Sequence, residues 1–349
     1  MLRQASRIGV VAAAALLACV GSGVSAAEMT PHEASLYEAA KSEGDLTWYV
    51  AQFGGEPAER TAQAFTAKYP GVGVNVVRTT GQVAFARLMQ DIRANTAQCD
   101  VFSGTDIGHA VSLKEQNLLM QYVPENAAKV IEAYKDADPD GYFHTTNVNL
   151  FILIYNTDRV TEADAPTSWA DLVDARWADQ ISTGHPGFSG TVGSWVVLMR
   201  KLYGWDYFEQ MEALNPLIGR SGNDPVAILN SGERSVGTAP ISTAARNKAQ
   251  GNPIGIVYPT DGAMRQINVS AILANSPHPN AAKLFMEFLL SIEQSELVAE
   301  QFYEPLRPEV APPPGTLPAS EVKSLALTVP EMVDGIPEVI VEWRDTFGN

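Results

Sequence analysis

The spacing of apolar residues changes repeatedly along the first third of the chain. Apolar runs or every-second-residue alternation at 46–50 and 71–77 predict β-strands, and a third short strand is expected at 100–102. Residues 58–69 and 83–95 repeat apolar side chains every three or four positions, which is typical of helices with one buried face. Strands that alternate with helices in this order predict an α/β fold with mostly parallel strands.

The alternation continues through the rest of the chain. The segment 148–155 predicts a continuous β-strand, and shorter strands are expected at 181–183, 236–238 and 254–258. Polar residues that can cap helices predict helix starts at 166–172, at 187–191 and near 224–225. Two amphipathic helices are expected at 280–290 and 294–302, and the proline-rich segment 305–318 predicts a loop.

The first 26 residues have a pattern of their own. Arg3 and Arg7 precede a short apolar stretch, 8–20, and small residues follow at 24–26. A charged start, a short apolar region and a small-residue exit predict a secretory signal peptide, so we expect a periplasmic protein that begins after residue 26. Lipid attachment at Cys19 is the alternative to this cleavage.

Charge and composition narrow the possible functions. The 349 residues carry a net charge of −16, and removal of two signal arginines would make it −18 (−16 − 2). Such acidity argues against binding to nucleic acid, which needs a basic surface. Cys99 is the only cysteine after the signal, so no internal disulfide is possible, and we expect it to be buried. The five histidines show no metal-ligand spacing, and neither a metal nor a cofactor is expected.

Seven segments, taken in order, resemble one known family. They are GDLTWYV at 44–50, CDVFSGTD at 99–106, FILIYNTDRV at 151–160, PTSWADL at 166–172, SGERSVG at 231–237, NPIGIVYPTDG at 252–262 and HPNAAKLFMEFLLSIEQSELVA at 278–299. The set resembles the bacterial extracellular solute-binding proteins of ABC importers, which have the type II periplasmic-binding-protein fold. The similar branch contains receptors for ferric ion, thiamine, polyamines, and phosphonates or sugar phosphates.

The resemblance implies two α/β lobes joined by a hinge, with a small solute clamped between them. The lobes would close through contacts made only in the shut form. The implied division is a signal peptide at 1–26, lobe 1 at 27–146 and 263–310, lobe 2 at 147–262 with hinge crossings near 147–155 and 258–268, and a C-terminal tail at 311–349 packed on lobe 2. The implied partners are a small-molecule ligand and an inner-membrane ABC permease, and the protein is expected to be a monomer.

Candidate ligand-binding residues follow from where such lobes bind their ligands. Ligands contact the carboxyl ends of parallel strands and the helix N-termini behind them, and the hinge crossings lie close by. The residues at these places are Tyr49, Phe53, Ser103, Thr105, Asp106, Ser189, Gly190, Thr191, Ser221, Asn223, Thr238, Ser242, Tyr258 and Asp261. Helix capping is the alternative role for the small polar ones.

The ligand itself is less constrained. Ferric-binding relatives place adjacent tyrosines in the segment equivalent to 238–243, and this segment has none, which argues against iron. Hydroxyl-glycine loops with Arg246 or Arg265 favour an anionic or zwitterionic organic solute of the phosphonate or sugar-phosphate type. Asp106, Asp224 and Asp261 leave a polyamine or thiamine cation as the alternative.

Other functional classes also need a test. The sequence Gly187-Phe188-Ser189-Gly190-Thr191 fails the G-x-S-x-G nucleophile elbow at its last position, and no HExxH motif is present. A binding protein without catalytic residues is therefore expected rather than an exported hydrolase. A receptor that reports to a sensor protein is a further alternative, because the sequence does not identify the surface that meets a partner.

Overall fold

The computed structural model describes residues 29–135, 137–317 and 321–348. The expected signal peptide and Cys19 lie outside the described residues. The strands are β1 Leu46–Val50, β2 Val74–Arg78, β3 Val101–Gly104, β4 Phe143–Asn156, β5 Ile181–Thr183, β6 Leu217–Ile218, β7 Val236–Pro240, β8 Ile254–Val257, β9 Ala263–Ile272 and β10 Ser324–Leu325. The helices are α1 Pro31–Ala40, α2 Gly55–Lys68, α3 Gly81–Arg93, α4 Ile107–Glu115, α5 Gly190–Tyr203, α6 Asp206–Ala213, α7 Asp224–Asn230, α8 Ile241–Ala249, α9 Pro279–Leu289, α10 Ile292–Glu300 and α11 Val329–Phe347.

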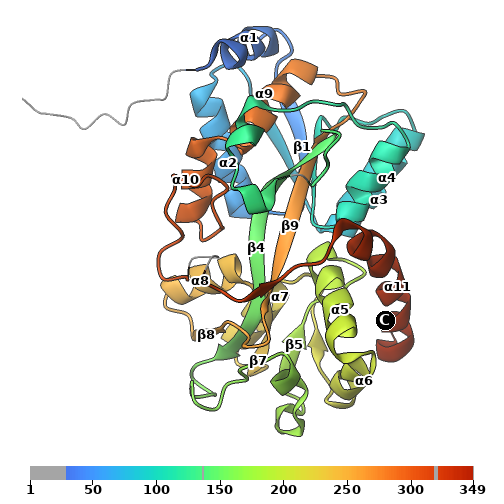
Figure 1. Ribbon diagram of the computed structural model, residues 1–349, viewed down its shortest axis with the longest axis vertical. Coiled ribbons are helices and arrows are strands. Elements are labelled where there is room, and N and C mark those ends of the chain that lie inside the picture. Colours follow the sequence, from blue (N-terminus) through green and yellow to red (C-terminus); the bar gives the residue numbers. More distant parts are fainter. Residues whose placement is uncertain (1–28, 136, 318–320, 349) are drawn as a thin grey trace, which may run out of the picture.

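One mixed sheet runs through the molecule in the order β2-β1-β3-β9-β4-β7-β5-β6, while β8 pairs with β4 and β10 with β9. At one end β1 pairs in parallel with β2 and β3, and at the other end β5 pairs in parallel with β6 and β7. Antiparallel β4 and β9 join these two groups and run along the molecule between them (Figure 1). The predicted α/β fold is confirmed, and its parallel strands lie at the two ends.

Most predicted elements are present, and two predictions need correction. The strand predicted at 148–155 begins earlier, at Phe143, because the polar residues that precede it are buried and paired in the sheet. The helix predicted at 166–172 is wrong, and only a 3-10 turn forms at Ala170–Val173. There the Asp171 carboxylate accepts hydrogen bonds from the backbone N–H groups of Thr167 and Ser168, which holds the segment as a turn.

Each end of the sheet has an apolar cluster of its own, and a third cluster extends across both ends. The upper end in Figure 1 packs α2, α9 and α10 against β1, with Trp48, Phe65 and Phe285 at the centre. The Phe285 ring lies 5.0 Å from Trp48 and 5.1 Å from Phe65, centroid to centroid, in edge-on contacts. Cys99 is buried, as expected, and burial raises the pKa of its thiol.

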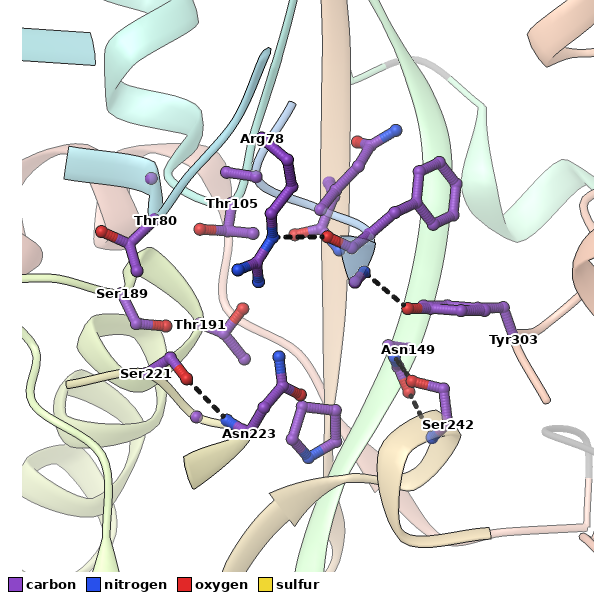
Figure 2. A pocket seen from close by; sticks show the side chains of 18 residues that line it. Arg78, Thr80, Thr105, Asn149, Ser189, Thr191, Ser221, Asn223, Ser242 and Tyr303 are labelled. Carbon is purple, nitrogen blue, oxygen red and sulfur yellow. Dashed lines mark hydrogen bonds between the residues drawn. The ribbon is translucent and has the colours of Figure 1, made fainter. Parts of the chain in front are cut away.

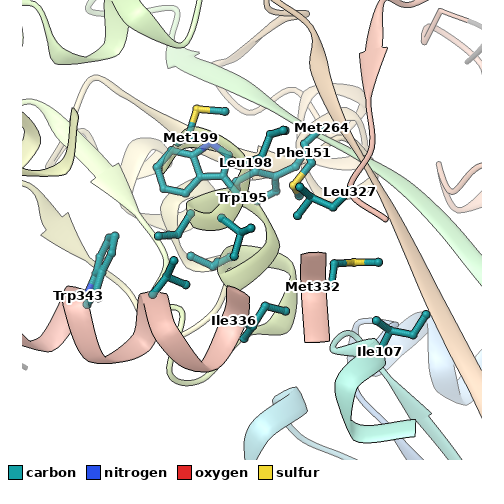
Figure 3. Close-up of a cluster of buried hydrophobic side chains, with 14 of the residues drawn as sticks. Ile107, Phe151, Trp195, Leu198, Met199, Met264, Leu327, Met332, Ile336 and Trp343 are labelled. Carbon is teal, nitrogen blue, oxygen red and sulfur yellow. The ribbon is translucent and has the colours of Figure 1, made fainter. Parts of the chain in front are cut away.

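The C-terminal helix α11 packs along α5 at the lower end (Figure 3). Two glycines permit this contact, because a Cβ on Gly193 would lie 3.0 Å from Ile336 and one on Gly335 would lie 2.9 Å from Val197. The same apolar cluster includes Ile107 at the start of α4. The tail therefore contacts elements of both ends, whereas the sequence analysis expected it to pack on one lobe.

A buried carboxylate ties three segments of the upper end together. Asp100, which is fully buried, accepts hydrogen bonds from the backbone N–H groups of Thr47 and His278 and from the Ser276 hydroxyl. The His278 ring nitrogen Nδ1 lies 3.0 Å from its Oδ2. The start of β1, the start of β3 and the approach to α9 thus share one acceptor.

We predict that Asp100→Ala lowers the free energy of unfolding by about 2–4 kcal/mol, because it leaves several buried donors without an acceptor. Urea denaturation followed by circular dichroism measures the change. Asp45→Ala is the control, since Asp45 accepts one exposed hydrogen bond, from Gly73 N–H. Equal destabilisation by the two substitutions would contradict the anchoring role of Asp100.

Candidate functional site

A cavity lies where the two parallel strand groups approach each other, beside β4 and β9. Its lining residues come from many separate segments, and Figure 2 shows their side chains converging on a shared space. They are Ala51, Gln52, Phe53, Gly54, Arg78, Thr80, Gly81, Thr105, Asn149, Ser189, Thr191, Ser221, Gly222, Asn223, Pro240, Ser242, Asn268 and Tyr303.

Arg78 supplies the only charge among the described residues that line the cavity. It is the last residue of β2, its Nε donates to the carbonyl oxygen of Phe53 at 3.2 Å, and its guanidinium points toward the centre of the site (Figure 2). The ion pairs that described arginines form with carboxylates within 4 Å do not include Arg78. The cavity therefore presents an arginine without a carboxylate partner there.

Helix N-termini add partial positive charge around the same space. Thr80 is the N-cap residue of α3 and Ser189 that of α5, and both line the cavity. The Ser189 hydroxyl accepts from Val192 N–H, whereas the Thr80 hydroxyl is buried and has no hydrogen-bond partner among the described residues. Backbone N–H groups at helix starts, together with arginine, form a site suited to an oxyanion.

The start of α5, in the lower end, touches the loop between β3 and α4, in the upper end. An ideal Cβ on Gly190, the first residue of α5, would lie 2.6 Å from atoms of both Thr105 and Asp106, backbone atoms included. Since real Cβ atoms do not approach so closely, glycine is required at this contact between the upper and lower ends. Within the upper end, a Cβ on Gly81, the first residue of α3, would lie 2.7 Å from the Thr105 hydroxyl.

Amide and hydroxyl side chains form a second part of the lining, which we call the amide wall: Gln52, Asn149, Ser242 and Asn268. The Asn149 side-chain amide donates to the Ser242 hydroxyl at 2.7 Å, and the Gln52 amide donates to Thr146 at 3.0 Å. All four side chains are nearly fully buried. Because most of their polar atoms are already paired, the wall is held in a fixed orientation.

The structure brings seven of the fourteen candidate residues to the cavity: Phe53, Thr105, Ser189, Thr191, Ser221, Asn223 and Ser242. They come from the loops after β1 and β3 and from the starts of α5, α7 and α8. Strand ends and helix starts therefore predicted their common location. Their contact with a ligand stays a prediction.

Four other candidates are not among the residues that line the cavity. Tyr49 packs against α3, and its hydroxyl donates to Asp91 at 3.1 Å. Ser103 is fully buried and accepts from the Trp48 indole at 2.7 Å. Asp106 caps α4, and Gly190, at the start of α5, forms the backbone contact described above. The side chains of Tyr49, Ser103 and Asp106 thus have structural partners, and contact of these four residues with a ligand stays a prediction.

Three candidates from the second half are also placed elsewhere. The Thr238 hydroxyl is buried against that of Thr183, at 3.0 Å. Tyr258 lies in a separate cavity, where its hydroxyl accepts from Leu317 N–H and burial raises its pKa. Asp261 accepts from Trp169 N–H at 2.8 Å and holds the 3-10 segment to the start of β9. All three side chains have structural partners, and none of the three residues lines the cavity.

Several lining residues were not anticipated from the sequence. Arg78 is the last residue of β2 and Thr80 comes two residues later, so the strand-end rule that selected the other loops also applies to them. Asn149 and Asn268 lie within long strands, where no loop or cap signal marks them. Tyr303 lies after α10, and its hydroxyl accepts from Gly54 N–H at 3.2 Å. Arg265 lies in the separate cavity with Tyr258.

Within residues 29–135, 137–317 and 321–348, no helix is long and apolar enough to span a membrane. The same part of the chain holds no cluster of three or more His, Cys, Asp or Glu side chains with metal-binding geometry.

Comparisons with known proteins agree with this architecture. Residues 100–321 match the family model described as bacterial extracellular solute-binding protein. A probable ABC transporter periplasmic-binding protein of Sinorhizobium fredii is 27% identical over 313 residues, which cover 85% of this chain and 84% of the relative. A putative 2-aminoethylphosphonate-binding periplasmic protein of Salmonella typhimurium is 25% identical over 282 residues, 77% of each chain.

Solved structures show the same fold. The periplasmic binding protein AfuA of Actinobacillus pleuropneumoniae, solved with fructose-6-phosphate bound, superposes with a TM-score of 0.80 at 24% identity. The match covers 87% of this chain and 99% of that one.

The family match extends over more than half of the sequence, from within the upper end to the C-terminal tail. The chain belongs to the bacterial extracellular solute-binding proteins. It is the periplasmic solute-binding component of an ABC importer, as the ordered sequence segments had indicated, with a small-molecule ligand and an ABC permease as its partners.

Proposed function

We propose that the chain captures a small anionic organic solute in the cavity at Arg78 and delivers it to the importer's permease. The observation that carries this proposal is the arginine without a carboxylate partner, which faces a cavity whose other described lining groups are neutral. A phosphate or phosphonate would pair with the guanidinium and accept hydrogen bonds from the nearby hydroxyls and helix-start N–H groups.

The same geometry disfavours cations. Arg78 repels a ferric ion, a polyamine or thiamine, and Tyr303 is the only phenol among the described lining residues. The aspartates considered for a cationic ligand bind backbone donors: Asp106 accepts from Gly108 N–H and Asp224 from Ser221 N–H. A cation in this cavity would therefore lack the anionic ligands it requires.

Two similar proteins support a ligand that carries an oxyanion. One is named for 2-aminoethylphosphonate and the other was solved with fructose-6-phosphate, and both compounds carry a phosphorus oxyanion. Their organic parts differ, so the comparison favours the anionic group more than any single compound.

We infer two lobes that close around the solute. The upper end, with β1–β3, and the lower end, with β5–β8, are joined by β4 and β9. Each end has an apolar cluster of its own, and a third cluster extends across both. Both ends contribute cavity residues, with Arg78 and Thr80 from one and Ser189 and Ser221 from the other. A solute held from both sides favours the closed state over the open one.

The proposal includes export by the N-terminal signal, a monomeric state and binding without catalysis. The Ser189 hydroxyl, the nearest match to a hydrolase nucleophile, accepts a capping hydrogen bond from Val192 N–H, which supports a structural role. Failure to release product from a panel of esters would agree with binding alone.

Calorimetric titration of the purified chain tests the ligand class. The panel is fructose 6-phosphate, glucose 6-phosphate, 2-aminoethylphosphonate, spermidine, thiamine and ferric citrate. We expect saturable binding of phosphorylated or phosphonate compounds. Binding of spermidine, thiamine or iron alone would overturn the proposal.

Arg78→Gln is predicted to weaken binding of the best anionic compound by roughly 10- to 100-fold, the cost of one charge-assisted interaction of about 1.5–3 kcal/mol. Arg60→Gln is the matched control, because it removes the same charge from an exposed residue paired with Glu300. Titration of both variants gives the ratio of their affinities for the anionic compound. An equal, small loss of affinity in the two would contradict a role of Arg78 in binding.

Gly190→Ala is predicted to hinder closure, because its Cβ would overlap the backbone of Thr105 and Asp106. Overpacking of about 1–3 kcal/mol corresponds to roughly a 5- to 150-fold loss of affinity if the contact forms only in the closed state. Gly55→Ala is the control, since a Cβ there would meet nothing within 4 Å. Small-angle scattering should show ligand-induced compaction in the control and less of it in Gly190→Ala. Unchanged affinity and compaction would contradict the closure contact.

A further inference from the structure

We infer that the amide wall receives hydroxyl groups of the solute, so that the preferred ligand is a phosphorylated polyol rather than an aminoalkyl phosphonate. This inference rests on the proposed function, because it assigns the organic part of a solute whose anionic group lies at Arg78. It is carried by the hydrogen-bonding chemistry of Gln52, Asn149, Ser242 and Asn268.

The wall is connected to buried groups that fix its position. The Gln52 amide contacts Thr146, whose hydroxyl bonds to Ser270, and Ser270 in turn bonds to Ser103. Ser103 accepts from the indole of Trp48 in the upper core. This chain of polar contacts extends from the first strand to the cavity, so Gln52 meets a ligand in a preset orientation.

Asn268 has an unmet hydrogen-bonding group. Its side chain is 3% exposed, and its Nδ2 donates to Asn147 Oδ1 at 2.7 Å across the β4–β9 pair. Its Oδ1 is buried and has no partner among the described residues. A buried acceptor without a donor is unfavourable, and a hydrogen-bond donor from the solute would relieve this cost.

A hydroxyl suits these neighbours better than an ammonium group does. Amide and hydroxyl side chains both donate and accept, and so does a solute hydroxyl, whereas an ammonium group only donates. An ammonium group also carries a full charge, which is costly to bury without an anion. The described residues lining the cavity include no carboxylate to pair with it.

The carboxylates around the wall are engaged elsewhere. Beyond Asn149, the separate cavity holds Glu304 together with Arg265 and Tyr258. Glu304 bonds to the Tyr134 hydroxyl at 3.3 Å, and burial raises its pKa, which lowers its capacity to act as a counterion. An ammonium group at the wall would thus face neutral amides on one side and Arg78 on the other.

Titration of the wild-type chain with glucose 6-phosphate, sorbitol 6-phosphate, 2-aminoethylphosphonate and inorganic phosphate tests the inference. We expect a polyol phosphate to bind at least tenfold more tightly than either of the last two. Equal or tighter binding of 2-aminoethylphosphonate overturns the inference and leaves the anionic site intact. If no anion binds, or if Arg78→Gln leaves the affinity for the anion unchanged, the proposed function is overturned instead.

Asn268→Asp provides the second arm, because it places a carboxylate at the wall without changing the size of the side chain. Polyol phosphate affinity should fall by tenfold or more, and the ratio of 2-aminoethylphosphonate to polyol phosphate affinity should rise. Asn252→Asp, in the loop before β8, controls for the added charge. A thermal melt confirms that each variant folds, and Asn149→Asp replaces Asn268→Asp if that variant does not. An unchanged affinity ratio in the folded variant contradicts the assignment of the wall.

Discussion

The antiparallel pairing of β4 with β9 is the constraint on which the rest of the structure depends. These two strands connect the parallel groups at the two ends, so their register fixes where the loops after β1–β3 meet the helix starts after β5–β7. The cavity lies beside them because the carboxyl ends of both parallel groups converge there. A change of register in this pair would move Arg78 relative to Ser189 and would also displace core residues of both strands, such as Phe151 and Met264.

Polar side chains occur in this strand pair at a place where a sheet would normally be apolar. Asn147 pairs with Asn268 and Asn149 with Gln266, and all four side chains are nearly fully buried. Such groups contribute little net stability and are costly when left unpaired. We propose that ligand recognition explains their presence: Gln266 donates to the carbonyl of Thr105 at the rim, while Asn149 and Asn268 line the cavity. The crossing therefore joins the two ends and also forms part of the site.

The predictable and unpredictable parts of the site differ in physical origin. Helix starts and strand ends carry local signals, so Thr105, Ser189 and Thr191 could be assigned to the cavity from sequence. Packing decides the direction in which a side chain points. Tyr49 therefore packs against α3, although it lies near the end of β1 that faces the cavity. The orientation of the Asn268 side chain depends on a hydrogen-bond partner more than a hundred residues away, and no local sequence pattern predicts that contact. The α/β class and the order of elements follow from the periodicity of apolar residues. The position of helix α11 does not, because it depends on the packing of its apolar face against α5.

An anion site made mainly of neutral donors explains how capture and closure are coupled. In a chain of net charge −16, a cluster of lysines would attract the protein's own carboxylates, whereas one arginine with hydroxyls and backbone N–H groups would not. Arg78 and Thr80 lie on one side of the cavity, and Ser189, Thr191 and Ser221 lie on the other. Under the proposed function both sides contribute donors to a bound phosphate, so binding would favour the approach of the two ends, and the glycine contact at Gly190 would limit how closely they approach.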